Sequence, residues 1–317
     1  MSAGSPVDGL TARPPCPALA GVAPEPGVAK PDPILAIDSV CRRFDGLVAV
    51  DVEHLEVQRG VITALIGPNG AGKTTLFNLL TGFDKANAGT WTFDGERLSG
   101  LPSHKVARRG LVRTFQLTKA LSRLSVLENM LLGATNQRGE GFLTALVPPL
   151  WRDQERAIEQ QARTLLSRFG LEAMAEDFAG TLSGGQRKLL EMARALMAEP
   201  AMVLLDEPMA GVNPVLTQSL LAHVRTLPGD GTSVLFVEHD MDVVHDVSDW
   251  VVVMAEGRVI AEGPPDAIGA NQRVIDAYLG AHHDAPLDEA EERAQLEEAE
   301  ARIEAEVAGP APGGEDA

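Results

Sequence analysis

The chain has 317 residues, 44% of them hydrophobic and 23% charged, which is typical of a soluble globular protein with one large or two small domains. Its net charge is −18, with 12 acids and two bases after residue 283, and this acidic balance argues against unspecific nucleic-acid binding. The longest apolar runs have only strand length and no secretory leader is recognisable, so we expect no membrane span and a cytosolic chain by default.

The two ends of the chain differ in composition from its body. Residues 1–33 are rich in Pro, Ala and Gly, which predicts a disordered arm without an evident function. Residues 282–317 form an acidic tail that is either disordered or a single solvated helix with i,i+4 charge pairs, and a docking helix for a partner is the alternative. Between them, residues 34–281 are expected to form the folded domain.

The first chemical signal lies between two predicted strands, 34–40 and 48–57, whose apolar and polar residues alternate. Phe44 lies between them, flanked by charged residues and glycine. A single Phe normally belongs to a core, but this neighbourhood predicts an exposed ring that can stack on an adenine.

A phosphate-binding loop follows the apolar, β-branched strand 61–66 and precedes a predicted helix that stops at Gly82. The loop fits the pattern G-x-x-x-x-G-K-[ST], in which backbone N–H groups and the start of the helix surround phosphate oxygens. Lys73 is expected to reach the β- and γ-phosphates, and the Thr74 hydroxyl to bind Mg²⁺. The nine residues expected to bind the nucleotide are Gly67, Pro68, Asn69, Gly70, Ala71, Gly72, Lys73, Thr74 and Thr75.

A mainly helical region is predicted over about 104–200, after a third strand at 89–93. Helical apolar stripes cover 157–169 and 186–197, and a less patterned insertion covers 139–151. Ser183, Gly184, Gly185 and Gln186 open the second of these helices. The simplest interpretation is a Ser-capped helix start, but two glycines before a long helix also favour a second phosphate-facing terminus.

The apolar strand 202–206 ends in Asp206 and Glu207, and carboxylates at the end of a buried strand are costly unless they meet a cation. Beside a phosphate loop, Asp206 is expected to hold Mg²⁺ and Glu207 to act as base toward the attacking water. His239 follows the next predicted strand, 233–237, and together with these elements it is predicted to be functional. Residues 250–262 are predicted to form a hairpin that turns at Glu256–Gly257.

With these motifs in order, the chain resembles the nucleotide-binding subunits of ATP-binding cassette (ABC) transporters. The matching parts are the aromatic Phe44, the Walker A loop (67–75), the Q-loop Gln116, the signature (182–186), Walker B with its glutamate (203–207) and the switch His239. The resemblance implies a P-loop NTPase fold of the α/β class, with a RecA-like core, an antiparallel β subdomain and an α-helical subdomain.

The resemblance also implies a mechanism. Two subunits sandwich two ATP molecules, each between the P-loop of one chain and the residues Ser183–Gln186 of the other. Gln116 joins Thr74 and Asp206 around Mg²⁺, Lys73 neutralises charge, Glu207 polarises the water and His239 contacts the γ-phosphate. The implied partners are a second ATPase subunit, in a homo- or heterodimer, separate transmembrane permeases and, indirectly, a substrate-binding protein. The implied location is peripheral, on the cytoplasmic side of the plasma membrane.

Several segments are most similar to the larger ATPase of branched-chain amino acid importers, including 110–116, 124–129, 206–214 and 274–280. Two positions depart from the commoner family pattern, Asn213 in the D-loop and Phe instead of Tyr at residue 44. Urea importers and lipopolysaccharide or lipid exporters share the catalytic motifs and remain alternatives for the cargo. A non-transport ABC ATPase of DNA repair or translation is a weaker alternative, because those carry long insertions or paired cassettes.

Overall fold

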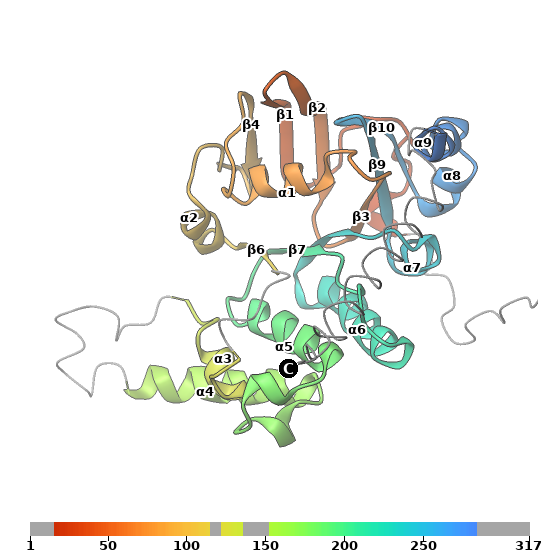
Figure 1. Ribbon diagram of the computed structural model, residues 1–317. Coiled ribbons are helices and arrows are strands. Elements are labelled where there is room, and N and C mark those ends of the chain that lie inside the picture. The colour runs from red at the N-terminus through yellow and green to blue at the C-terminus, as the bar shows by residue number, and fades with distance from the viewer. Residues whose placement is uncertain (1–15, 115–121, 136–151, 284–317) are drawn as a thin grey trace, which may run out of the picture. The chain divides into compact units, whose positions relative to one another are not determined.

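The computed structural model describes residues 16–114, 122–135 and 152–283 (Figure 1). The strands are β1 (Pro33–Phe44), β2 (Leu47–Gln58), β3 (Ile62–Ile66), β4 (Ala88–Phe93), β5 (Glu96–Arg97), β6 (Leu111–Arg113), β7 (Met202–Asp206), β8 (Ser233–Val237), β9 (Trp250–Ala255) and β10 (Arg258–Gly263). The α-helices are α1 (Lys73–Leu80), α2 (Ser103–Arg108), α3 (Val126–Leu131), α4 (Arg152–Arg168), α5 (Gly184–Leu196), α6 (Pro214–Thr226), α7 (Met241–Val247), α8 (Pro265–Gly269) and α9 (Gln272–His283).

The larger sheet has six strands in the order β10-β9-β3-β8-β7-β6. Strands β9, β3, β8, β7 and β6 are parallel, and β10 pairs with β9 as an antiparallel hairpin at the edge. The hairpin turns at Glu256–Gly257, as the sequence predicts. Because β3, β7 and β8 are parallel neighbours, the loops that follow them all lie at the same edge of the sheet, where ligands bind in open α/β folds.

The smaller sheet is antiparallel, with the order β2-β1-β4-β5. It contains the predicted strands 34–40, 48–57 and 89–93, and β1 and β2 form a long hairpin that closes where Phe44 pairs with Leu47. The mixed architecture of two sheets and a group of helices agrees with the predicted fold class.

Each face of the larger sheet belongs to its own hydrophobic core. In β7, Val203 and Leu205 belong to one buried cluster, whereas Met202 and Leu204 belong to the other. This alternation follows from the two-residue period of a strand. The apolar residues of α3, α4, α5, α6 and α7 fall in the first cluster, and those of α1 and the antiparallel sheet in the second. The helices α1 and α5 therefore cover opposite faces of the larger sheet.

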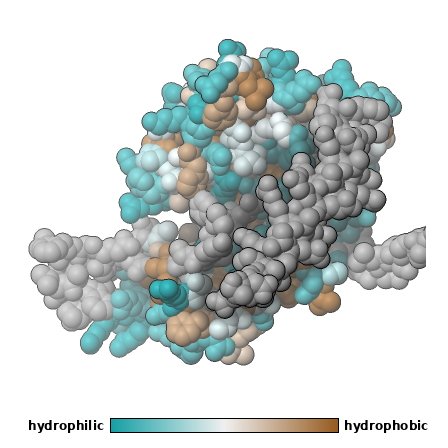
Figure 2. All heavy atoms as spheres, viewed as in Figure 1, coloured by the Kyte–Doolittle hydropathy of each residue, from teal (hydrophilic) through white to brown (hydrophobic). Residues whose placement is uncertain are grey.

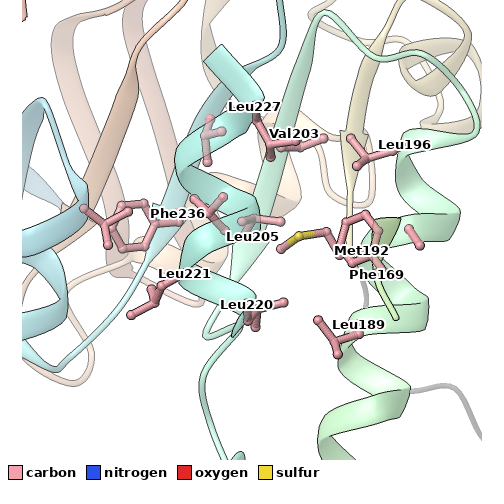
Figure 3. Packing of buried hydrophobic residues seen from close by; sticks show 14 of the residues in the cluster. Phe169, Leu189, Met192, Leu196, Val203, Leu205, Leu220, Leu221, Leu227 and Phe236 are labelled. Carbon is pink, nitrogen blue, oxygen red and sulfur yellow. The ribbon is translucent and has the colours of Figure 1, made fainter. Parts of the chain in front are cut away.

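The packing of α5 is shown in Figure 3, where Leu189, Met192 and Leu196 lie on the side of the helix that faces β7 and α6. These three positions recur at helical spacing, which confirms the predicted apolar stripe over 186–197. Burial of a side chain of this size is worth about 1.5–3 kcal/mol. The stripe therefore fixes the rotation of α5 and the direction of its glycine-rich start.

The prediction of a disordered arm is wrong for residues 16–33. A short 3₁₀ turn at Pro17–Leu19 buries Leu19 in the second core cluster. The Lys30 ammonium is also buried, and its Nζ lies 2.8 Å from Oε2 of Glu262 in β10. Composition predicted disorder here because local hydrophobicity is low, whereas the order comes from tertiary contacts with Glu56 and Gln58 in β2 and with Glu262 in β10. Residues 1–15 lie outside the described part of the chain.

The structure also changes the predicted start of the helical region and bears on the predicted end of the folded domain. Strand β6 belongs to the larger sheet, so the helices that pack together (α3, α4 and α5) begin after it and not at residue 104. The predicted insertion at 139–151 and the acidic tail from residue 284 lie outside the described residues. The compact unit that holds both sheets ends at Tyr278, within α9.

Among the described residues, no helix is both long enough and apolar enough to cross a membrane. On the face in Figure 2, hydrophilic residues separate small hydrophobic patches.

Candidate functional site

The phosphate-binding loop connects β3, whose five residues are all buried, to α1, which begins at Lys73. No side chain among the described residues caps the start of α1. The N–H groups of a first helical turn have no partners within the helix, so here they remain available to an anion. The predicted strand, loop and helix around the motif are all present.

Close packing holds the loop at both ends. A Cβ on Gly67 would lie 2.0 Å from the Met254 carbonyl oxygen, and one on Gly72 would lie 2.3 Å from the Ala49 carbonyl oxygen. Both glycines also have positive φ angles, which side chains disfavour. A Cβ on Gly70, in contrast, would meet no atom of the described residues within 4 Å. The loop is thus fixed between β9 and β2 while its middle is open, as a cradle for a phosphate chain requires.

Lys73 is buried within this loop. Its Nζ donates hydrogen bonds to the carbonyl oxygens of Gly67 at 2.6 Å and Pro68 at 2.9 Å. Burial lowers the pKa of Lys73, and the negative charges of Glu207 and Asp206 partly offset that shift. The Walker A cation and the two Walker B carboxylates therefore share one electrostatic environment, although they are far apart in sequence.

Asp206 ends β7 and is almost fully buried. Its Oδ2 lies 2.5 Å from the guanidinium of Arg113, which also donates to Oδ1 of Asn78 in α1 at 2.6 Å. Arg113 is the last residue of β6, the strand beside β7. The acidic strand end thus meets a cation, as the cost of a buried charge requires, and that cation comes from the neighbouring strand.

Glu207 lies next to the switch histidine. Its Oε1 is 2.6 Å from Nε2 of His239, and its backbone N–H donates to the Val237 carbonyl oxygen at 3.1 Å. Glu207 has a φ of 46°, a sparsely populated conformation for a residue with a side chain. Such local strain is common where a side chain must point into a site.

Glu238, between β8 and His239, is a buried carboxylate that accepts hydrogen bonds from the backbone N–H groups of Met209 and His239. Burial raises the pKa of Glu238, and the two backbone donors oppose that shift. Through these bonds Glu238 joins the segment after Glu207 to the segment that carries His239.

Phe44 is 43% exposed, as the sequence predicts, at the closed end of the β1–β2 hairpin. Its ring contacts the guanidinium of Arg42, whose carbon lies 4.2 Å from the ring centroid. The same hairpin brings the carbonyl of Ala49 against Gly72 of the phosphate loop. Phe44 is therefore presented by an element that borders the loop.

The second glycine-rich helix start is well formed. Ser183 caps α5 in a capping box: its Oγ accepts from the Gln186 N–H, and Gln186 Oε1 accepts from the Ser183 N–H. A Cβ on Gly184 would meet no described atom within 4 Å, whereas one on Gly185 would lie 2.3 Å from Cδ1 of Leu216. Gly185 thus lets α5 pack closely against Leu216 of α6, and Gly184 leaves the helix start open. The helix that these residues open, α5, and the helix that follows the phosphate loop, α1, cover opposite faces of the larger sheet.

The donors near the phosphate loop suit a magnesium–nucleotide complex. Mg²⁺ is usually held by one or two protein oxygens together with substrate phosphates. Asp206 supplies a carboxylate here, and Thr74 stands in the first turn of α1. Within the described ranges, no group of three or more His, Cys, Asp or Glu side chains could hold a metal ion without such a substrate. Gln116, the third predicted ligand, lies outside the described residues.

Comparisons with known proteins agree with this geometry. Residues 50–210 match the family model described as ABC transporter, and residues 258–284 match that described as branched-chain amino acid ATP-binding cassette transporter. The high-affinity branched-chain amino acid transport ATP-binding protein BraF of Pseudomonas aeruginosa is 42% identical over 250 residues, 78% of this chain and 98% of the relative. The chain belongs to the ABC transporter family.

Further relatives extend the match. The probable branched-chain amino acid transport ATP-binding protein LivG of Archaeoglobus fulgidus is 42% identical over 248 residues, 78% of this chain and 96% of the relative. A solved ATP-binding cassette of an ABC transporter in its ADP conformation has a TM-score of 0.69 and 36% identity, and the match covers 78% of this chain and 99% of that chain.

Membership of the ABC family confirms the predicted fold class and the predicted activity. The chain is an ATP-binding and ATP-hydrolysing subunit whose reaction is coupled to transport across a membrane. Sequence reasoning missed Arg113 and Glu238 as parts of the site. Each is a charged residue at the end of an apolar strand, the same signal that drew attention to Asp206 and Glu207.

Proposed function

We propose that this ABC subunit powers the import of branched-chain amino acids. The observation that carries the proposal is the match of residues 258–284 to the family model named for branched-chain amino acid transporters. This segment forms β10, α8 and α9, outside the motifs that all ABC ATPases share. The BraF and LivG relatives, which are named as branched-chain amino acid transport ATP-binding proteins, support the same cargo.

In the proposed mechanism the loop 67–75 binds the phosphates of ATP through its backbone N–H groups and the first turn of α1. Lys73, now bonded to two carbonyls of its own loop, turns toward the β- and γ-phosphates when the nucleotide enters. Phe44 stacks on the adenine from the β1–β2 hairpin.

Thr74, Asp206 and Gln116 would hold Mg²⁺, which supplies charge neutralisation for phosphoryl transfer. Asp206 is suited to this role because its carboxylate is buried at the strand end beside α1 and held by Arg113.

Glu207 accepts a proton from the attacking water. Before ATP binds, His239 holds the Glu207 carboxylate in place through their 2.6 Å contact, and with ATP bound the imidazole contacts the γ-phosphate. The side chain of Glu207 is one-third exposed, so water can reach it. Glu238 accepts hydrogen bonds from the backbone N–H groups of Met209 and His239, and so holds the segment after Glu207 beside the segment that carries His239.

A second ATPase subunit completes each site. The helix start at Ser183, Gly184, Gly185 and Gln186 would contact the γ-phosphate of an ATP held by the partner, as the sandwich of two ABC subunits implies. The open space at Gly184 supports this contact. The partner is a second copy or a related ATPase. Transmembrane permeases would hold the pair at the cytoplasmic side of the membrane. A substrate-binding protein would be an indirect partner that acts through the permeases.

The proposal is tested by reconstituting the subunit with the permeases and the binding protein of a branched-chain amino acid importer in proteoliposomes that contain ATP. Uptake of radiolabelled leucine, isoleucine and valine is expected, together with ATPase stimulation by the amino-acid-loaded binding protein. Glu207→Gln serves as the inactive control. Uptake of urea instead, or lipid export without amino acid uptake, would reject the cargo while leaving the ATPase assignment intact.

A further inference from the structure

Arg113 connects three parts of the ATPase site. It ends β6, its guanidinium contacts Asp206 at the end of β7, and the same guanidinium donates to Asn78 in α1, the helix that begins at the phosphate loop. Its central carbon also lies 5.6 Å from the ring centroid of Phe77 in the same helix. Arg113 therefore ties the acidic strand end to the phosphate-loop helix.

The ion pair between Arg113 and Asp206 is almost completely buried. The side chain of Arg113 is 10% exposed and that of Asp206 is 7% exposed. A buried carboxylate held by one rigid, planar guanidinium has little freedom to rotate, and the fork of a guanidinium can bond Asp206 and Asn78 at the same time. A lysine has a single ammonium group, so it would keep the charge without reproducing this two-sided geometry.

We propose that Arg113 is a positioning residue for the magnesium–nucleotide complex, which orients the Asp206 carboxylate relative to α1. The inference rests on the proposed function, since it requires Asp206 to be a magnesium ligand. Partners of ligating carboxylates commonly set the affinity for the metal, and their loss costs about 10–100-fold. The Arg113 guanidinium donates to Oδ2 of Asp206, and it is held in place by its hydrogen bond to Asn78 in α1.

The main test is Arg113→Lys in the full-length protein. Binding of a fluorescent ATP analogue is measured as a function of Mg²⁺ concentration, and binding of ADP is measured in EDTA. We expect the Mg²⁺ concentration for half-maximal effect to rise about tenfold, with ADP binding in EDTA changed less than about twofold. Electron paramagnetic resonance of Mn²⁺ in the presence of the analogue is expected to show the same loss of affinity.

Asn78→Ala provides a second, milder variant, because it releases the guanidinium from α1 and leaves the pair with Asp206. It is expected to shift the Mg²⁺ dependence in the same direction by a smaller factor. Arg59→Lys is the matched control, since Arg59 forms exposed ion pairs with Asp32 and Asp94. It is expected to leave the Mg²⁺ dependence unchanged.

Two results would overturn the inference: a wild-type Mg²⁺ dependence in Arg113→Lys, or an equal loss of binding with Mg²⁺ and in EDTA, which would indicate a merely structural role. Asp206→Asn separates the inference from the proposed function. If that variant keeps the wild-type Mg²⁺ dependence, the ligand role of Asp206 fails. If it loses that dependence while Arg113→Lys keeps it, only the role of Arg113 fails.

Discussion

His239 and Glu207 lie in contact, with Nε2 of the imidazole 2.6 Å from Oε1 of the carboxylate. The two residues are separated by 32 positions in the sequence and follow adjacent parallel strands, β8 and β7. The imidazole is therefore placed where it can orient the carboxylate that is proposed to receive the proton from water.

The first prediction concerns Glu207 itself. Glu207→Gln keeps nearly the same shape but cannot accept a proton, so ATP binding should persist while steady-state hydrolysis falls by at least about 100-fold. Phosphate release and equilibrium binding of an ATP analogue measure the two properties separately. Unchanged steady-state hydrolysis would contradict the base role.

The contact between His239 and Glu207 predicts that their substitutions are not additive. His239→Ala alone should lower kcat strongly, because the carboxylate loses the group that orients it, while adding it to Glu207→Gln should lower kcat little further. A double-mutant cycle on kcat measures the coupling. Full additivity of the two effects would show that the residues act independently.

Gly184 and Gly185 are adjacent but should respond differently to Ala. A methyl at Gly185 would collide with Leu216, so Gly185→Ala should destabilise the fold by about 1–3 kcal/mol. Gly184→Ala should leave the stability nearly unchanged, because its Cβ meets no described atom within 4 Å, yet lower the ATPase rate by obstructing the nucleotide of the partner subunit. Thermal unfolding and ATPase assays are compared for both. Normal ATPase activity in Gly184→Ala would argue against the contact across subunits.

The buried pair of Lys30 and Glu262 predicts that the segment before β1 stabilises the domain. Besides Lys30, Glu262 accepts bonds from the Val28 N–H and from Nε1 of Trp250. Lys30→Met would leave an uncompensated buried carboxylate and should cost about 3–5 kcal/mol of unfolding free energy, measured by urea denaturation.

The control for Lys30 is Arg59→Met, which removes exposed ion pairs and should cost no more than about 1 kcal/mol. Equal losses in the two variants would show that the buried pair has no special role.

His223 predicts a pH dependence of stability. Its ring stacks on Phe169 with the centroids 4.2 Å apart, and burial, followed by the charge of Arg168, lowers its pKa from 6.5. The unfolded chain therefore binds a proton at a higher pH than the folded chain, so this contribution to stability is present above pH 6.5 and is lost as the pH falls through the folded pKa.

The variant His223→Phe keeps a stacked ring but cannot titrate. Wild type should lose stability relative to this variant between about pH 7.5 and 5.5, as measured by urea denaturation at each pH. A constant difference between the two proteins over that range would contradict the lowered pKa.

The sequence by itself determined the parts of this protein that depend on local patterns. The loop 67–75 was predictable because its glycines stand at fixed spacing between a strand and a helix, and the stripe of α5 because its period is helical. The acidic end of β7 and the exposed ring of Phe44 were also predictable, since each depends on its immediate neighbours.

Only the tertiary structure decided which residues meet across the chain. It paired Arg113 with Asp206 and His239 with Glu207, and it buried Lys30 against Glu262, where composition had predicted disorder. It also placed α1 and α5 on opposite faces of one sheet. Strand order brings such residues together, and strand order arises from long-range packing that no local pattern encodes.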